Sequence, residues 1–169
     1  MVSLVRTTAR RALSLAFLAA LPMASACRAV AHTSAEPQFI HPDGPPANPF
    51  SPAVRVGNII FVSGTLGTKP DGTLVPGGIQ AETRQLLENI KGTLASAGVG
   101  MDRVVKCTVF LADLKEWPAM NEVYRSYFSN GNYPARTAVQ ATLLFGARVE
   151  IECAAAAPGY SSAASPSRL

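Results

Sequence analysis

The sequence predicts one α+β domain in which two helices pack on one face of a mixed sheet. Three observations lead to this fold class: short runs in which apolar and polar residues alternate, a long segment with apolar residues three and four positions apart, and the order of these segments in the 169-residue chain. Alternation is typical of a half-buried strand, and the three-four spacing is typical of an amphipathic helix. Strands grouped around two helices indicate an α+β layout.

The first 31 residues are predicted to be a cleavable signal peptide. Residues 1–11 carry three arginines and no acidic residue, and residues 12–26 are apolar and end in small side chains. This is the order of a secretory signal, with cleavage expected after Ala26 or Ala31. We therefore expect a secreted or periplasmic protein. The apolar run is shorter than the roughly 20 residues of a membrane span, so we expect no stable membrane insertion.

Three other uses of the leader stay open. The Arg10-Arg11 pair could belong to a twin-arginine signal, although Ala9 precedes it where serine or threonine is usual. The arginine-rich, acid-free composition also fits a mitochondrial transit peptide. Cys27 could be lipidated after cleavage, but Ala24 stands where that signal would have leucine.

Removal of the leader changes the charge of the domain. The whole chain holds 15 basic and 11 acidic residues, and cleavage after Ala31 removes four arginines, which leaves 11 of each sign. The basic character of the full chain therefore belongs to its leader. A neutral domain offers no electrostatic attraction to nucleic acid, so we expect no nucleic acid partner.

Histidine and cysteine are sparse. Both histidines, His32 and His41, precede the predicted core, and no group has the spacing of a metal site, so we expect no metal. Cys107 and Cys153 each alternate with apolar residues on predicted strands. We favour two buried free thiols there, with a disulfide in an oxidising compartment as the alternative.

The domain is preceded by an extended segment at residues 32–48, which is rich in proline and small polar residues and is not expected to form a regular element. Strands are then predicted at 53–56 and 59–63. Gly57-Asn58 between them predicts a tight hairpin.

Two helices are predicted, at 79–97 and from 117 or 118 to 128. Gly98 follows the first helix as a usual stop signal, and Pro118 suits the first turn of the second. The apolar stripes at helical spacing are Ile79, Leu86, Leu87, Ile90, Leu94 and Ala97 in the first helix and Met120, Tyr124, Tyr127 and Phe128 in the second.

The remaining strands are predicted at 103–111, 136–144 and 148–157, and the last two are expected to form a second hairpin. The tail at 159–169 consists mainly of serine, alanine and proline and is expected to be disordered. On the strand at 103–111, alternation places Val105, Cys107, Val109 and Leu111 on one face and Val104, Lys106, Thr108 and Phe110 on the other. Since the helices cover only one face, the second apolar face predicts a closed oligomer.

Three charged residues, Arg136, Glu150 and Glu152, interrupt the last two apolar strands. Removing an unpaired charge from water costs about 3 kcal/mol or more. These side chains therefore either satisfy one another or wait for a ligand.

Several segments together resemble the RidA/YjgF family of reactive-intermediate (enamine/imine) deaminases, and we place a RidA-like domain at residues 49–158. The segments are Val-Gly-Asn-Ile-Ile-Phe-Val-Ser-Gly at 56–64, Glu-Asn-Ile-Lys at 88–91, Val-Val-Lys-Cys-Thr-Val-Phe-Leu-Ala-Asp-Leu at 104–114, Pro-Ala-Arg-Thr-Ala-Val at 134–139 and Val-Glu-Ile-Glu at 149–152. The resemblance implies a chorismate-mutase-like fold, a homotrimer whose sheets form a central barrel, and ligand sites in clefts between subunits.

The resemblance also implies an activity and its residues. The activity is hydrolysis of 2-imino and 2-enamino acids to 2-oxo acids and ammonia, without metal or cofactor. Arg136 would hold the substrate carboxylate, and Glu150 would position water or a proton, while Ser63 and Phe50 would line the pocket. Phe50 departs from the family, which usually has tyrosine there, and the loop from Leu144 to Val149 is one residue short.

These roles agree with the chemistry of the side chains. A guanidinium binds a carboxylate through two parallel hydrogen bonds, and a carboxylate can direct water at an imine carbon or pass a proton to the leaving ammonia. Glu152 follows Glu150 on the same strand face, about 7 Å away, and is interpreted as scaffold. The alternative function is an exported trimeric module that binds small carboxylates or proteins with little catalysis. A third function attached to the family is that of an endoribonuclease. The neutral charge of the domain after residue 31 argues against it.

Overall fold

The computed structural model describes residues 36–45, 48–128 and 131–157. The predicted signal peptide at 1–31 and the predicted tail at 159–169 lie outside these ranges. The elements are β1 (Gln38–Ile40), β2 (Ala53–Val56), β3 (Ile59–Leu66), α1 (Gly78–Ser96), β4 (Val104–Leu111), α2 (Trp117–Arg125), β5 (Ala135–Gln140) and β6 (Val149–Ala156), with short 3₁₀ turns at Met101–Arg103, Leu114–Glu116 and Leu144–Gly146. In the described ranges, no helix is both long and apolar enough to cross a membrane.

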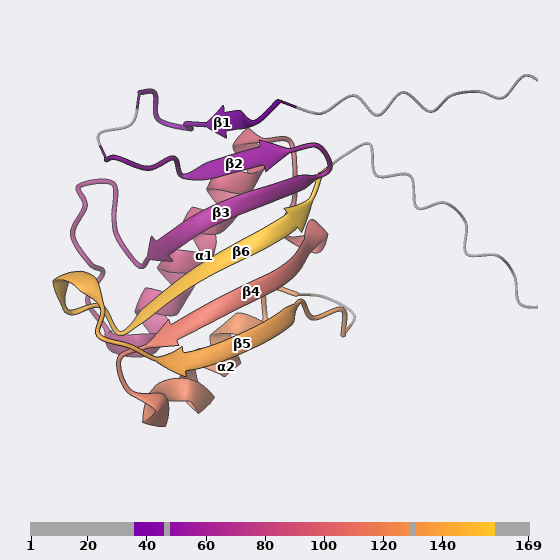
Figure 1. Cartoon of the computed structure of the whole chain (residues 1–169). Coiled ribbons are helices and arrows are strands. Elements are labelled where there is room, and N and C mark those ends of the chain that lie inside the picture. The colour runs from indigo at the N-terminus through magenta and orange to yellow at the C-terminus, as the bar shows by residue number, and fades with distance from the viewer. Residues whose placement is uncertain (1–35, 46–47, 129–130, 158–169) are drawn as a thin grey trace, which may run out of the picture. The chain divides into compact units, whose positions relative to one another are not determined.

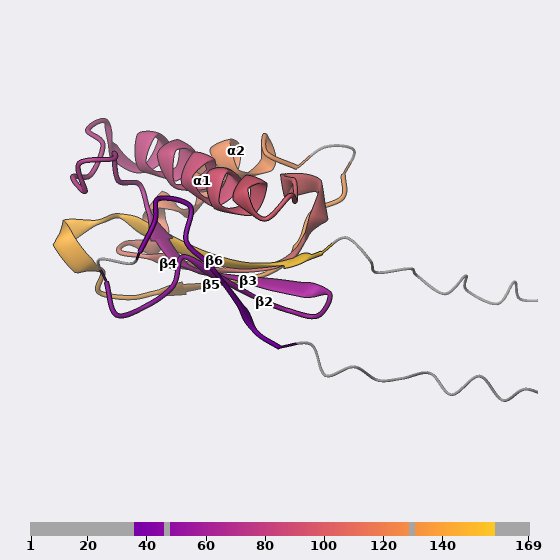
Figure 2. The same ribbon diagram turned by 90° about the horizontal axis from the view of Figure 1, so that it is seen from above.

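The strands form one mixed sheet in the order β1-β2-β3-β6-β4-β5 (Figure 1). Neighbouring strands run antiparallel except β4 and β5, which are parallel. Seen from above, α1 and α2 lie together on one side of the sheet (Figure 2). The predicted α+β fold, with two helices on one face of a mixed sheet, is therefore confirmed.

The core lies between α1 and the central strands. Helix α1 contributes a buried stripe at the predicted spacing, and β3, β4 and β6 contribute the opposing side chains. Gly98 ends α1 as expected, because its backbone is left-handed (φ 71°). In this conformation the Gly98 N–H donates to the Ala95 carbonyl and the Val99 N–H donates to the Leu94 carbonyl. The buried side chains at this interface include Ile60, Leu86, Leu87, Ile90, Leu94, Val109 and Ile151.

The predicted second hairpin is wrong. Strand β6 does not pair with β5; it lies between β3 and β4 and pairs antiparallel with both. Strand β5 ends at Gln140, earlier than predicted, and is joined to the parallel strand β4 by α2. Parallel neighbours require a crossover of this kind, usually through a helix. Alternating side chains identify strands but do not say which strands are neighbours, so a local pairing was expected where a long-range one occurs.

Three smaller differences have local causes. The segment predicted to lack regular structure contains β1, which pairs with β2 over only three residues and is too short to show alternation. A register shift in β4 between Val104 and Lys106 breaks the predicted faces, so that Val104 is buried and Val105 is exposed. Helix α2 ends at Arg125 rather than at 128, because the next residues form a tighter turn in which N–H groups donate to carbonyls three positions back.

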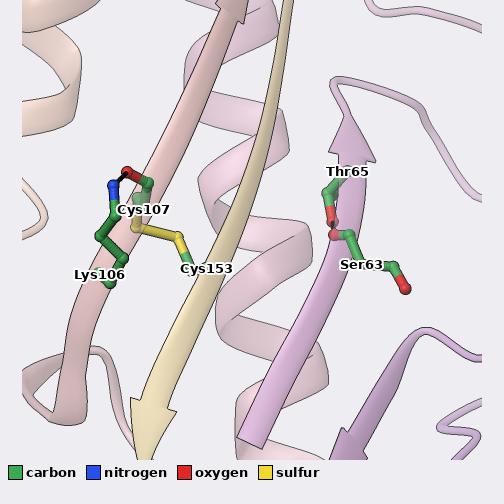
Figure 3. The surroundings of a disulfide bond; sticks show 5 residues. All are labelled: Ser63, Thr65, Lys106, Cys107 and Cys153. Carbon is green, nitrogen blue, oxygen red and sulfur yellow. Dashed lines mark hydrogen bonds between the residues drawn. A yellow bond between two sulfur atoms is a disulfide. The ribbon is translucent and has the colours of Figure 1, made fainter. Parts of the chain in front are cut away.

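The expected free thiols are also wrong, because Cys107 and Cys153 form a disulfide (Figure 3). The two residues lie directly opposite each other on β4 and β6, and their exposed fractions are 0% and 5%. They are 46 positions apart in sequence. Their proximity depends on the position of β6 between β3 and β4, which the pattern of the individual strands does not show. The bond joins two central strands on the helix side of the sheet.

The face opposite the helices carries large exposed apolar side chains, as predicted for the uncovered side of the sheet. Phe39, Phe61 and Val139 are 65%, 54% and 40% exposed, and Phe39 on β1 and Phe61 on β3 share one row across the sheet because both lie opposite Val54 of β2. We call this side the open face. An apolar face of this kind is typical of a surface that associates with other protein.

Candidate functional site

Arg136 lies on edge strand β5 and projects toward α2. Its register partner on β4 is Cys107, whose side chain is buried on the helix side of the sheet. The guanidinium carbon lies 4.6 Å from the ring centre of Tyr124 and 5.7 Å from that of Trp117, both on α2. Rings at this range attract a cation through their electron-rich faces.

Arg136 is not used in a structural ion pair within the described ranges. The salt bridges there join Lys69 to Asp71, Lys91 to Glu88 and Arg148 to Glu116. The alternative in which Arg136 and the strand glutamates satisfy one another is therefore not realised in this chain. A guanidinium stacked on rings still presents its planar N–H edge, which is the part that binds a carboxylate.

Glu150 lies on β6 and projects from the open face. Its register partners are Phe110 on β4 and Leu66 on β3. The carboxylate reaches over Gly64, where any side chain would overlap Glu150 Oε1, so glycine leaves the space that this rotamer fills. Partial burial raises the pKa of the Glu150 carboxyl, and the neighbouring charge of Glu152 raises it further. A raised pKa makes this carboxylate a stronger proton acceptor than an ordinary glutamate.

The structure does not bring Arg136 and Glu150 together in one protomer. Arg136 projects from the helix side at the β5 edge, Glu150 projects from the open face, and β4 lies between their strands. In the described part of the chain, one cavity of about 520 Å³ lies at the ends of β4 and β5 and another of about 520 Å³ lies beside β1, and neither is lined by these two residues. A site containing both side chains would need a second copy of the chain.

Ser63 lies next to Gly64, the residue over which Glu150 reaches, and Phe50 lies in the segment that Ser63 contacts. Ser63 immediately precedes Gly64, and its hydroxyl donates to the Ser51 carbonyl at 2.7 Å. The same residue's N–H donates to the Pro52 carbonyl at 3.0 Å, so Ser63 anchors the segment that carries Phe50. Phe50 is 53% exposed. The Ser63 hydroxyl therefore donates its hydrogen within the chain, and its oxygen can only accept a hydrogen bond from a ligand.

Two other charged residues, Lys106 on β4 and Glu152 on β6, have simpler surroundings. Lys106 donates to the Cys107 carbonyl and to Thr137 Oγ1, both at 3.2 Å, which agrees with a hydrogen-bonded rather than a nucleophilic lysine. Glu152 is exposed, and its charge acts on Glu150. No three His, Cys, Asp or Glu side chains of the described residues gather as a metal ion would require.

The sequence did not reveal Tyr124, Trp117 and Gly64 as parts of this arrangement. Helical spacing placed Tyr124 in the buried stripe of α2, but it gave no sign that Arg136 would lie on its ring. Gly64 follows a predicted strand and resembled an ordinary strand end. In each case the missing information was which segments are neighbours in space.

Comparisons with known proteins agree with the fold and the motifs. The family model described as Endoribonuclease L-PSP matches residues 42–157. A mouse protein named 2-iminobutanoate/2-iminopropanoate deaminase is 43% identical over 135 residues, which cover 79% of this chain and 94% of the mouse protein. The human protein of the same name is 42% identical over 135 residues, covering 79% and 93%.

Solved structures give the same result. RidA from an Antarctic Psychrobacter species superposes with a TM-score of 0.65 at 39% identity, covering 70% of this chain and 98% of that one. Escherichia coli TdcF, solved with bound serine, gives a TM-score of 0.63 at 32% identity over 70% and 98%. The family match over most of the chain and the identity to these relatives lead to one conclusion: the chain belongs to the RidA/YjgF family.

Proposed function

We propose that this protein is an imine deaminase that hydrolyses 2-imino and 2-enamino acids, without metal or cofactor. The observation that carries the proposal is Arg136, a guanidinium held on two aromatic rings with no carboxylate paired to it in the described ranges. The names of the mouse and human relatives, which are 2-iminobutanoate/2-iminopropanoate deaminases, support the same substrate class.

The proposed reaction needs placement of charge more than a strong nucleophile. A 2-enamino acid first gains a proton at C3 and loses one from nitrogen, which gives the 2-imino acid. Water then adds to the imine carbon, the resulting amino alcohol loses ammonia, and a 2-oxo acid remains. Arg136 holds the substrate carboxylate by two hydrogen bonds. The Glu150 carboxylate accepts a proton from the attacking water and, once protonated, gives it to the leaving nitrogen; its raised pKa supports both steps.

We further propose that the working form is a homotrimer whose sheets form a central barrel and whose sites lie between subunits. Two observations support this assembly. The open face is apolar and exposed, and Arg136 and Glu150 project from opposite faces of one chain. An interface that places the β5 edge of one subunit against the open face of the next would join Arg136 of one copy with Glu150 of the other.

The decisive assay follows the decay of 2-iminopropanoate, generated in place by an amino-acid oxidase, with the wild type and Arg136→Ala. The imine also hydrolyses in water, so a reaction without protein sets the baseline. We expect wild type to accelerate the decay and Arg136→Ala to return it to near the baseline. Equal acceleration by wild type and Arg136→Ala would contradict the proposal.

A second candidate function is a trimeric binding module for small carboxylates or proteins. Phe50 favours it, because this exposed ring lacks the hydroxyl that the family usually has at this position. Carboxylate binding by calorimetry, with no faster imine decay, would select this candidate. An endoribonuclease would need a basic surface, whereas the domain after Ala31 is neutral; we expect no RNA binding at low or high salt.

We also propose that the protein is secreted or periplasmic, with mitochondrial import and a lipid anchor at Cys27 as alternatives for the same leader. The disulfide between Cys107 and Cys153 supports export, because such bonds persist mainly in oxidising compartments. Fractionation of the native host with mass measurement of the mature chain tests this. Export predicts a chain that begins at residue 27 or 32 and lies outside the cytoplasm; an uncleaved cytoplasmic chain would contradict it.

A further inference from the structure

We propose that Tyr124 is a positioning residue for Arg136, and that Tyr124 and Trp117 together form an aromatic seat that orients the guanidinium for carboxylate binding. The inference deepens the proposed function and rests on the carboxylate-binding role of Arg136. It assigns to α2, which contains none of the residues singled out by the family motifs, a direct part in substrate affinity.

The geometry of α2 builds the seat. Trp117 and Tyr124 are seven positions apart and so lie on one face of the helix, two turns from each other. Strand β5 runs beside β4 in a parallel register that projects Arg136 toward this helix face. The guanidinium carbon is then 4.6 Å from the Tyr124 ring centre and 5.7 Å from the Trp117 ring centre, both inside the range of cation–π attraction.

Tyr124 is held firmly enough to act as a fixed surface. Its exposed fraction is 3%, and its ring packs against Phe128 with 4.8 Å between ring centres. Burial raises the pKa of its hydroxyl to about 12, so the ring is a neutral phenol throughout the working pH range, although the Arg136 charge acts in the opposite direction. A rigid ring restricts the rotamers of the long arginine side chain before the ligand arrives, which lowers the entropy lost on binding.

Within the described ranges, the hydroxyl of Tyr124 makes no hydrogen bond that would connect this residue to the site. Its oxygen is buried and has no hydrogen-bond partner in the described part of the chain. A buried hydroxyl without a partner is a cost, so phenylalanine at this position would keep both the core packing and the ring that faces Arg136. The contact that the ring makes with Arg136 is the feature that connects Tyr124 to the site.

The test compares Tyr124→Phe, Tyr124→Leu and Phe128→Leu. Tyr124→Phe keeps the ring that faces Arg136. Tyr124→Leu removes that ring, and Phe128→Leu is the matched control that removes a neighbouring ring not in contact with Arg136. Each trimeric protein is examined for the binding constant of 2-oxobutanoate, for KM and kcat with 2-iminopropanoate, for the melting temperature, and for the ring-current shift of the Arg136 side-chain protons by NMR.

We expect Tyr124→Phe to match the wild type in binding and in ring-current shift. In Tyr124→Leu the shift should be lost and 2-oxobutanoate binding should weaken about tenfold, with a similar rise in KM and a smaller change in kcat, since one cation–π contact is removed. Phe128→Leu should lower the melting temperature and leave the shift and the binding constant unchanged. If Tyr124→Leu does not fold, Trp117→Leu at the more exposed ring replaces it and should weaken binding about threefold.

The outcomes separate this proposal from the proposed function. A lost shift together with weaker 2-oxobutanoate binding in Tyr124→Leu, with wild type that does not turn over imines, would retain the seat and reject the deaminase. An unchanged shift and binding constant in Tyr124→Leu would overturn the seat whatever the activity of the wild type. Equal losses in Tyr124→Phe and Tyr124→Leu would also overturn it, because the hydroxyl rather than the ring would then be the acting group.

Discussion

Arg136 and Glu150 project from opposite faces of the same sheet. Arg136 extends from the β5 edge toward the rings of α2, and Glu150 extends from β6 across Gly64 on the open face. Arg136, which would bind the carboxylate, and Glu150, which would transfer the proton, are thus held by different neighbours within one chain. Each group can therefore be altered with little effect on the other.

The pH dependence of activity should report the surroundings of Glu150. Its pKa lies above the ordinary value of 4.5, first because of burial and second because of Glu152, so kcat/KM should rise with pH through a value above 4.5. Glu152→Gln removes the second cause and should move this acid limb to lower pH. Glu150→Gln should remove the limb along with most of the activity. An acid limb at the same pH in wild type and Glu152→Gln would contradict the assignment.

The same shift has a consequence for stability. The folded chain holds the Glu150 proton more tightly than the unfolded chain, because the folded pKa is the higher one. The stabilising contribution is therefore complete below pH 4.5 and is lost as the pH rises through the folded pKa. Urea unfolding at a series of pH values should show this loss in wild type and not in Glu150→Gln.

The disulfide between Cys107 and Cys153 should stabilise the domain by restricting the unfolded chain. For two residues 46 positions apart, its removal should lower the free energy of unfolding by about 2–4 kcal/mol. Urea unfolding of Cys107→Ala/Cys153→Ala, with wild type unfolded in reductant as the matched comparison, measures this. Thiol titration of the mature wild type in denaturant without reductant should find both of these cysteines unreactive; two reactive thiols would show that the bond is absent.

Buried Glu82 should be needed for the start of β6. This side chain of α1 is 5% exposed, and its Oε2 accepts the Arg148 N–H at 2.8 Å, two residues before Glu150. Glu82→Ala leaves that amide without its partner and should cost about 1–3 kcal/mol of unfolding free energy. Glu122→Ala, which removes an exposed helix glutamate bonded to Gln80, is the control and should cost less than about 0.5 kcal/mol. Equal losses in the two variants would refute the role of Glu82.

Local patterns were sufficient for the elements and their layers. The three-four spacing of apolar residues and Gly98 predicted α1 to within about one residue at each end, and Gly57-Asn58 predicted the β2–β3 hairpin, whose register indeed pairs Val56 with Ile59. The apolar second face of the sheet was also correctly expected. These features depend on residues close together in sequence, where turn chemistry and side-chain periodicity act directly.

Long-range pairing was beyond such patterns. Strand β6 lies between β3 and β4, which contradicts the predicted second hairpin. This position places Cys153 beside Cys107 and Glu150 beside Gly64. The seat of Arg136 on Tyr124 likewise depends on the parallel pairing of β4 and β5. The roles of Arg136, Glu150, Ser63 and Phe50 came from the family motifs and remain proposals. What the structure adds is that one chain does not assemble them into one site.

Subunit complementation tests the central claim most directly. Arg136→Ala and Glu150→Gln, each near baseline alone, are co-expressed with different tags, and mixed trimers are isolated through both tags. Each mixed trimer would place an intact Arg136 against an intact Glu150 of the neighbour at one of its sites, which is about one site in three. Sites shared between subunits therefore predict that 2-iminopropanoate hydrolysis recovers to a substantial fraction of the wild-type rate. Mixed trimers as inactive as either variant alone would contradict a site built from Arg136 of one subunit and Glu150 of the next.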